Sequence, residues 1–396
     1  MSTCAAKAWA LGALTTYDVM LPPSPPPPPT PPSPPPPSLT FSTIATTGPR
    51  QFNNCYMYSG AAAVGNKVVF APVDANNVGV LDTYTGNFIT VATTGTSSSG
   101  ENKYAGAAAV ANKVYFTPDS QCNVGVFDTT NNIFTTVVTS YGNSYAGCGN
   151  YEREYAGAVA LGDIVYFAPY AKNDVGVFNT TSNVFSTIAL TGAASSHIGR
   201  YSGAVAVGNK VYFAPHMQDN VGVLDTTTNV FSTVATTGDA YNSAPSTDSG
   251  SSMEATGRRL TSHDGPITQK YGGAAAVGTL VVFAPYNQNN VGLFDTTSDT
   301  FTTVATTGDA ASGDAKYGGA VTVGTKVYFS PRDGESSSKT TLGIFDTATN
   351  VFNTIAVERG SYPMNSATLR YDGAAVVGTK VYFAPSSEDN VGVLQS

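Results

Sequence analysis

The chain has 396 residues, of which 12% are charged, and its formal net charge at pH 7 is -8. This acidity excludes nucleic acid and anionic membrane surfaces as expected partners, because both require clustered Lys and Arg side chains. The sequence contains no apolar run near the roughly 18 residues that a spanning helix needs, so we expect no membrane insertion.

The N-terminal part divides into two segments. Residues 1–21 contain Lys7 and a short apolar stretch, which resembles a weak signal peptide, although a disordered segment is the alternative. Residues 22–38 consist of Pro with Ser and Thr, a composition that predicts a semi-rigid polyproline II stalk. This stalk resembles the hydroxyproline-rich glycoproteins of plant and green-algal walls, and the resemblance implies an extracellular, cell-surface or cell-wall location. The alternative is an intracellular scaffold that recruits SH3- or WW-type partners.

Residues 39–396 are built from one repeated unit, which opens with Tyr-x-Gly-Ala. The unit is 46 residues long in its shortest copies, and loop insertions account for the longer ones. A period of this length predicts a solenoid, an array or a propeller. The opening tyrosines are Tyr58, Tyr104, Tyr155, Tyr201, Tyr271, Tyr317 and Tyr371.

The two ends of the repeat region decide between these architectures. The last unit lacks the phenylalanine segment that closes the others, whereas such a segment stands at residues 41–48, before the first unit. Residues 371–396 and 39–57 therefore make one unit that is split across the termini. A split of this kind benefits a closed ring, because the shared blade locks the two ends together. We predict an all-β fold: a seven-bladed β-propeller with four-stranded antiparallel blades, in which the N-terminal strand completes the last blade.

Each unit contains four short β segments separated by turn residues. In the first unit we expect strands at 60–64, 67–71, 78–81 and 88–92. The first strand holds small residues because seven copies crowd around the axis, and the later strands carry larger side chains. The turn between the third and fourth strands begins with an aspartate that we expect to cap the turn backbone, at Asp82, Asp128, Asp225, Asp295 and Asp346.

The most regular part of the unit reads Val-Tyr-Phe-Ala-Pro, then Asn-Val-Gly-Val and Asp-Thr, then Phe-x-Thr-Val-Ala-Thr-Thr-Gly. It resembles the YVTN repeat of cell-surface propellers and, less closely, the Kelch repeat. Ala-Pro stands where Kelch repeats have a Gly-Gly pair, and the fourth strand lacks the Kelch tryptophan. The resemblance covers nearly all of residues 39–396 and implies a seven-bladed propeller.

The loops that vary in length lie on one face of the predicted ring. That face carries the links between units and the loops between second and third strands, so we expect function there, with neutral drift as the alternative. Aspartates in these loops, such as Asp74 and Asp119, are expected to form turns, and Ca²⁺ or hydroxyl binding is the alternative. The seven tyrosines open their units on this face, where they could stack on sugar rings or instead pack and bond a neighbour. The candidate binding residues are His216, which lies near the axis, and Tyr58, Tyr104, Tyr155, Tyr201, Tyr271, Tyr317 and Tyr371.

The cysteines and one sequon bear on location. Cys122 and Cys148 fall in consecutive loops of one face and are the best candidate disulfide, whereas reduced thiols in the cytosol are the alternative. Asn179 opens an Asn-x-Thr sequon on an exposed turn and would carry a glycan in a secreted protein.

The sequence offers little for catalysis. It has three histidines, none at zinc-ligand spacing, and it lacks phosphate-binding and nucleophile-elbow motifs. We therefore expect no catalytic residue, metal or cofactor, and a non-enzymatic propeller that binds a glycan or protein of the extracellular matrix or cell wall. A lyase or oxidoreductase with a site at the axial channel, assembled from separate blades, is the alternative.

Overall fold

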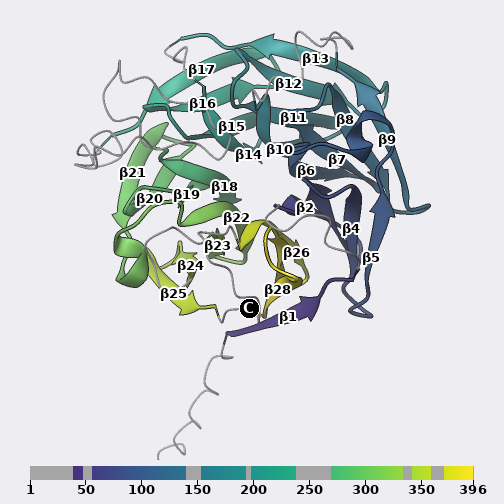
Figure 1. The fold of residues 1–396 in the computed structure, drawn as a ribbon. Coiled ribbons are helices and arrows are strands. Elements are labelled where there is room, and N and C mark those ends of the chain that lie inside the picture. Colours follow the sequence, from purple (N-terminus) through teal and green to yellow (C-terminus); the bar gives the residue numbers. More distant parts are fainter. Residues whose placement is uncertain are drawn as a thin grey trace, which may run out of the picture. The chain divides into compact units, whose positions relative to one another are not determined.

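The computed structural model describes residues 39–47, 56–139, 153–192, 198–237, 269–332, 341–357 and 370–395. In this part of the chain the strands form seven four-stranded antiparallel sheets, arranged as blades around an axis (Figure 1). The predicted fold class is thereby confirmed. The segments predicted at 1–21 and 22–38 lie outside the described residues.

The bounds of the strands repeat from blade to blade. Blade 1 contains β2 (Tyr58–Val64), β3 (Lys67–Pro72), β4 (Asn77–Asp82) and β5 (Phe88–Ala92). Blade 2 contains β6 (Tyr104–Val110), β7 (Lys113–Pro118), β8 (Asn123–Asp128) and β9 (Ile133–Val138). Blade 3 contains β10 (Tyr155–Leu161), β11 (Ile164–Pro169), β12 (Asp174–Asn179) and β13 (Val184–Ala189). Blade 4 contains β14 (Tyr201–Val207), β15 (Lys210–Pro215), β16 (Asn220–Asp225) and β17 (Val230–Ala235).

The remaining blades follow the same pattern. Blade 5 contains β18 (Tyr271–Val277), β19 (Leu280–Pro285), β20 (Asn290–Asp295) and β21 (Thr300–Ala305). Blade 6 contains β22 (Tyr317–Val323), β23 (Lys326–Pro331), β24 (Thr341–Asp346) and β25 (Val351–Ala356). Blade 7 contains β26 (Tyr371–Val377), β27 (Lys380–Pro385), β28 (Asn390–Gln395) and β1 (Thr40–Ala45). The single 3-10 turns η1 (Gly95–Ser98) and η3 (Gly308–Ala311) lie in links between blades.

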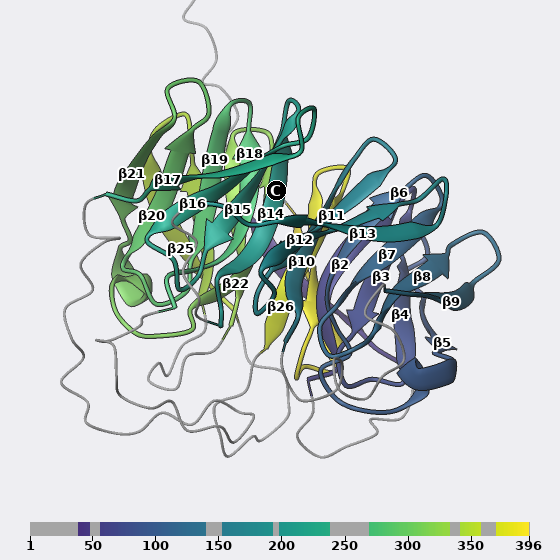
Figure 2. The same ribbon diagram turned by 90° about the horizontal axis from the view of Figure 1, so that it is seen from above.

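The first strand of each blade lies nearest the axis and the fourth lies at the rim; Figure 2 shows the blades in a second view. The described residues contain no helix that is long and apolar enough to span a membrane.

The N-terminal strand closes the ring as predicted. β1 pairs antiparallel with β28, with Thr40 opposite Gln395 and Ala45 opposite Asn390 (Figure 1). Beyond β1, the Thr47 hydroxyl donates a hydrogen bond of 2.6 Å to the carbonyl oxygen of Phe88 in blade 1. The start of the repeat region is thus bonded to the last blade and to the first.

In blade 7, β1 supplies the aromatic ring of the fourth strand. In the other blades, a tyrosine of the first strand packs against one phenylalanine of the second strand and one of the fourth. In blade 7 the fourth-strand ring is Phe41, whose centroid lies 6.2 Å from that of Tyr371 and 6.1 Å from that of Phe383. Gly392 leaves the space for this ring, because a Cβ atom there would lie 2.9 Å from Phe41 Cζ.

The first strands meet at the axis through a ring of glycines. A Cβ atom built on Gly373 would lie 2.5 Å from the Cα of Gly60, and one on Gly60 would lie 2.7 Å from the Cα of Gly106. A larger residue would push neighbouring blades apart, which confirms that axial crowding selects the small residues. The ring consists of Gly60, Gly106, Gly157, Gly203, Gly273, Gly319 and Gly373.

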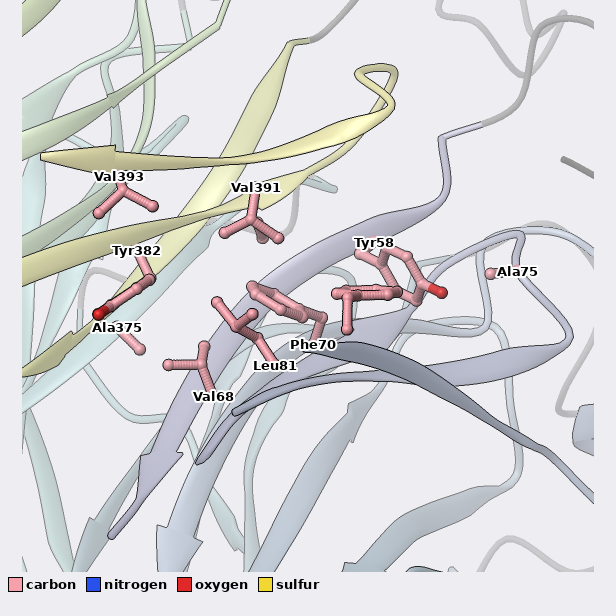
Figure 3. Close-up of a cluster of buried hydrophobic side chains, with 11 residues drawn as sticks. Tyr58, Val68, Phe70, Ala75, Leu81, Ala375, Tyr382, Val391 and Val393 are labelled. Carbon is pink, nitrogen blue, oxygen red and sulfur yellow. The ribbon is translucent and has the colours of Figure 1, made fainter. Parts of the chain in front are cut away.

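The hydrophobic core lies between blades. Between the first and last blades, Val68 and Phe70 belong to the same buried cluster as Tyr382 and Val391 (Figure 3). Burying one such side chain contributes roughly 1.5–3 kcal/mol. Each blade is therefore stabilised by both neighbours, and the first and last blades of the repeat region stabilise each other.

Candidate binding site at the axial channel

The loops between second and third strands and the links between blades share one face, which we call the loop face. Backbone hydrogen bonds join them: Lys103 N donates to Val73 O at 2.9 Å, and Asp119 N donates to Lys103 O at 3.1 Å. Glu154 N continues the series by donating to Asp119 O at 2.7 Å. The loop face is thus a connected rim around the axis.

The seven repeat tyrosines lie on this side of the ring, but inside it. Each is at most 2% exposed, and burial raises the pKa of the hydroxyl in, for example, Tyr58 and Tyr201. In six blades the hydroxyl donates to an Asn or Asp oxygen at the start of the third strand, at 2.5–2.6 Å. A ring without an exposed face cannot stack on a sugar, so these tyrosines serve packing in this structure.

In five of the seven units a Lys or Arg stands immediately before the repeat tyrosine, and these side chains form a ring of buried cations beside the ring of tyrosines. Lys103 Nζ donates to Gly100 O at 2.7 Å, and Arg200 Nη2 donates to Asn173 Oδ1 at 2.5 Å. The Lys103 bond lies within the link between blades 1 and 2, whereas the Arg200 bond joins the link before blade 4 to the second-to-third strand loop of blade 3. The ring was not predicted, although Lys or Arg before the tyrosine recurs in five units. Its members are Lys103, Arg200, Lys270, Lys316 and Arg370, all 8% exposed or less.

The axial channel opens onto the loop face through a cavity of about 130 Å³. Its walls are the first strands of the seven blades, with Gly and Ala as the main residues and Ser59 and Ser202 as hydroxyls. Asp372 is the one charged residue of this lining. The channel wall is therefore nearly featureless, and chemical variety is concentrated around its entrance.

Seven side chains at the entrance form a connected group that we call the axial cluster: Asp119, Arg153, Tyr170, His216, Tyr286, Arg332 and Asp372. His216 lies in the middle, with its ring centroid 5.6 Å from that of Tyr170 and 5.3 Å from that of Tyr286. A guanidinium covers each tyrosine, since Arg153 Cζ lies 4.6 Å from the Tyr170 centroid and Arg332 Cζ lies 5.1 Å from the Tyr286 centroid.

An aspartate ends the cluster on each side. Arg153 Nε lies 3.1 Å from Asp119 Oδ2, and Arg332 Nη1 lies 3.2 Å from Asp372 Oδ1. The order of contacts is therefore Asp–Arg–Tyr–His–Tyr–Arg–Asp, contributed in sequence by blades 2 to 7 and the link before blade 3. The Ser59 hydroxyl of blade 1 donates to Asp372 Oδ2 at 3.0 Å and extends the contacts to the remaining blade.

Two glycines make room for the larger members. A Cβ atom on Gly318 would lie 2.7 Å from Arg332 Cδ and still closer to the Asp372 carboxylate. A Cβ atom on Gly272 would lie 2.6 Å from the carbonyl oxygen of Tyr317 in the next blade and 3.2 Å from Tyr286 Cδ2. The other units have Ser, Ala or Asp at this position, so glycine occurs in the two blades in which Tyr286 and Arg332 cover the first strand.

The electrostatics of the cluster keep its histidine neutral. Burial, and then the charges of Arg153 and Arg332, lower the pKa of His216 to about 4. Its Nδ1 lies 2.9 Å from the carbonyl oxygen of Tyr271, so Nδ1 carries the proton that the bond requires. Burial raises the pKa of Asp119 to about 6, although Arg153 acts in the opposite direction.

Both arginines retain unused hydrogen-bond donors. The buried Nε of Arg332 has no hydrogen-bond partner among the described residues. In the same part of the chain, Arg153 donates through Nε to Asp119, its Nη atoms make no hydrogen bond, and its side chain is 36% exposed. An anionic or oxygen-rich ligand at the entrance would satisfy these donors.

Sequence reasoning identified one member of this cluster as a binding residue. His216 lies at the axis as expected, and Asp119 lies in an ion pair, whereas the prediction for it was a turn. Arg153, Tyr170, Tyr286, Arg332 and Asp372 were missed. A signal existed for three of the missed members, Tyr170, Tyr286 and Arg332, because the residue after the repeated proline of the second strand varies among the units. Along the chain it is Val73, Asp119, Tyr170, His216, Tyr286, Arg332 and Ser386.

The other sequence predictions concern residues that lie outside this entrance. The turn aspartates cap backbone N–H groups as predicted; Asp225 Oδ1, for example, accepts from Thr227 N at 2.9 Å. Asn179 does the same through Oδ1, and its glycosylation stays a prediction. Cys122 is disulfide-bonded, but Cys148 lies outside the described residues, so their pairing stays a prediction. Within the described residues, His, Cys, Asp and Glu form no group of three or more that could hold a metal ion.

Comparisons with known proteins add information on the fold. No protein family model matches the chain, and no curated protein matches it. Among solved structures it is similar to that of U3-55K, with 9% identity and a TM-score of 0.58 over 90% of this chain and 98% of that chain. It is also similar to a chain of the mitotic checkpoint complex, with 11% identity and a TM-score of 0.56 over 90% of this chain and 91% of that chain.

A third similar structure is the extracellular domain of the one-component system protein BT4673 from B. thetaiotaomicron. The identity is 8% and the TM-score 0.52, over 86% of this chain and 41% of that chain. At these identities the similarities establish the fold alone. The YVTN and Kelch resemblances therefore stay predictions.

Proposed function

We propose that this protein is a non-enzymatic binding propeller, whose ligand contacts the axial cluster on the loop face. The observation that carries the proposal is the contrast between uniform blades and a varied entrance. The residue after the second-strand proline varies among the seven units, and five of these residues belong to the axial cluster, whose Asp372 lines the cavity. Packing alone explains residues that repeat, whereas it does not explain two arginines with unused donors beside a channel.

We propose a glycan or a protein of the extracellular matrix or cell wall as the ligand. The proline-rich segment at 22–38 supports this location through its resemblance to wall glycoproteins. The disulfide at Cys122 also supports an oxidising compartment, and it counts against an intracellular scaffold. Mass spectrometry of the native protein should find hydroxyproline within 22–38, and unmodified prolines there would oppose a wall location.

The binding proposal is tested with an array of wall polysaccharides and matrix proteins, probed with the labelled full-length chain. A double variant of the entrance, Tyr286→Ala with Arg332→Ala, should lose the signal. A control variant on the opposite face, Thr379→Ala with Lys380→Ala, should retain it. Equal signals from both variants would place the binding surface elsewhere, and an array without any signal from the wild type would contradict the proposal.

One observation favours a second candidate, an enzyme at the same entrance. A neutral histidine between two tyrosines, flanked by guanidiniums, contains groups able to move a proton and to stabilise a developing negative charge. Such a site would suit a lyase. Product formation from the bound polysaccharide that disappears in His216→Gln would favour the enzyme, whereas binding without turnover favours the non-enzymatic propeller.

A further inference from the structure

We infer that the axial cluster recognises an acidic sugar, with Arg153 and Arg332 binding the anionic group and Asp372 accepting hydrogen bonds from hydroxyls. The inference rests on the proposed binding function and narrows its ligand to one chemical class.

The two arginines present positive charge from both sides of the same entrance. Burial lowers the pKa of Arg332, and the nearby charge of Arg153 lowers it further, whereas Asp372 and Tyr286 raise it and the net direction is upward. Both charges also act on His216, which lies between them. Two neighbouring cations with unused N–H groups favour a ligand with negative charge, because guanidinium binds carboxylate or sulfate oxygens through charge-assisted bonds.

Their aspartate partners hold the arginines in place without using all their donors. Arg153 engages Asp119 through Nε, and Arg332 engages Asp372 through Nη1. Stacking over Tyr170 and Tyr286 fixes the planes of the two guanidiniums. The donors are therefore preorganised, which reduces the entropy lost when a ligand binds.

The same entrance also presents acceptors and hydroxyls. Asp372 lines the cavity together with Ser59, and its side chain is 17% exposed. A carboxylate next to the guanidiniums would repel a simple anion, but it accepts hydrogen bonds from hydroxyl groups. A ligand that carries both an acid group and several hydroxyls satisfies this mixture, and a uronic acid residue of a polysaccharide is such a ligand. A sulfated sugar shares this chemistry.

Calorimetric titration of the full-length chain with trigalacturonate tests the inference. Galactotriose is the neutral probe and a sulfated galactotriose is the second anionic probe. We expect trigalacturonate to bind at least about tenfold more tightly than galactotriose, with an affinity that falls as salt is added. Tighter binding of the sulfated probe would assign the anionic group as sulfate. Equal affinity for all three would overturn the inference and leave the binding function intact, whereas no binding of any glycan would count against both.

Variants separate recognition from folding. Arg332→Gln should weaken trigalacturonate binding about tenfold or more and leave galactotriose binding nearly unchanged. If Arg332→Gln does not fold, the double variant Arg332→Gln with Asp372→Asn takes its place. It leaves no unpaired buried charge, because it removes both charges of the ion pair. The matched control Lys380→Gln removes one exposed positive charge at the start of β27, on the opposite face, and should bind like the wild type. A folded Arg332→Gln protein that retains the wild-type preference for the acid would overturn the inference.

Discussion

The N-terminal strand should carry a large part of the stability of the whole ring. The test compares two truncations, one that begins at residue 38 and one that begins at residue 48. The first removes the proline-rich segment and leaves β1 in place. The second also removes β1, and with it the ring of Phe41 and the hydroxyl bonds of Thr46 and Thr47.

The contacts of β1 set the size of the effect. Removing a buried phenylalanine side chain costs about 3–5 kcal/mol, and Phe41 is only partly buried, so we take about 3 kcal/mol for its ring. The two hydroxyl bonds add about 1 kcal/mol each. The sum, about 5 kcal/mol, is comparable to the whole free energy of unfolding of a marginally stable protein. Loss of β1 also exposes the edge of β28, which favours aggregation.

Thermal unfolding followed by circular dichroism, together with size-exclusion chromatography, measures both effects. The protein that begins at residue 38 should melt like the full chain and elute as one species. The protein that begins at residue 48 should melt far lower and form aggregates. Equal melting temperatures for the two truncations would refute closure of the ring by β1.

Three further predictions concern the axis and the disulfide. Because the pKa of His216 is lowered to about 4 in the folded state, its contribution to stability should be fully present above pH 6.5 and fall by up to about 3 kcal/mol as the pH drops toward 4. Burial raises the pKa of Asp119 and of Glu154, which act in the opposite direction, so the test is the difference between the wild type and His216→Gln in denaturant titrations; a difference that does not change with pH would contradict a neutral buried histidine. Gly106→Ala places a Cβ atom 2.7 Å from the Cα of Gly157, so crowding should cost about 1–3 kcal/mol. In Gly65→Ala the Cβ would meet nothing within 4 Å, and the φ of 58° alone should cost about 1 kcal/mol; a Gly106→Ala protein as stable as the wild type would argue against axial crowding. Cys122→Ser should lower stability by about 2–4 kcal/mol under oxidising conditions, and a difference that persists in reductant would assign the effect to packing instead of the disulfide.

The fold could be predicted from the sequence because every strand is repeated. Phe41 and its neighbours match the segment that closes the other units, so the missing part of blade 7 was recognisable before its position was known. The predicted strands of the first unit were short by up to two residues. β2 begins at Tyr58 because the chain continues to pair with Pro72 beyond an irregularity that ends at Ala61, and Gly60 has a φ of 82° there.

The site was less predictable because its members are not part of the repeated motif. Arg153 lies in a link between blades, Arg332 follows β23, and Asp372 takes the place of Ser, Ala or Gly in the other units. Their contact depends on how blades 2 to 7 converge at the axis, which no local pattern encodes. The repeat tyrosines are the opposite case. They were easy to find because they recur in every unit, but they recur because every blade needs the same packing, and this regularity does not mark a binding site.

A crystal structure of the full-length protein with trigalacturonate tests the central claim most directly. We predict that the sugar lies at the axial entrance of the loop face, with a carboxylate of the ligand bonded to Arg153 or Arg332 and a hydroxyl bonded to Asp372. Trigalacturonate bound at the rim or on the opposite face, with the axial cluster unoccupied, would contradict this account.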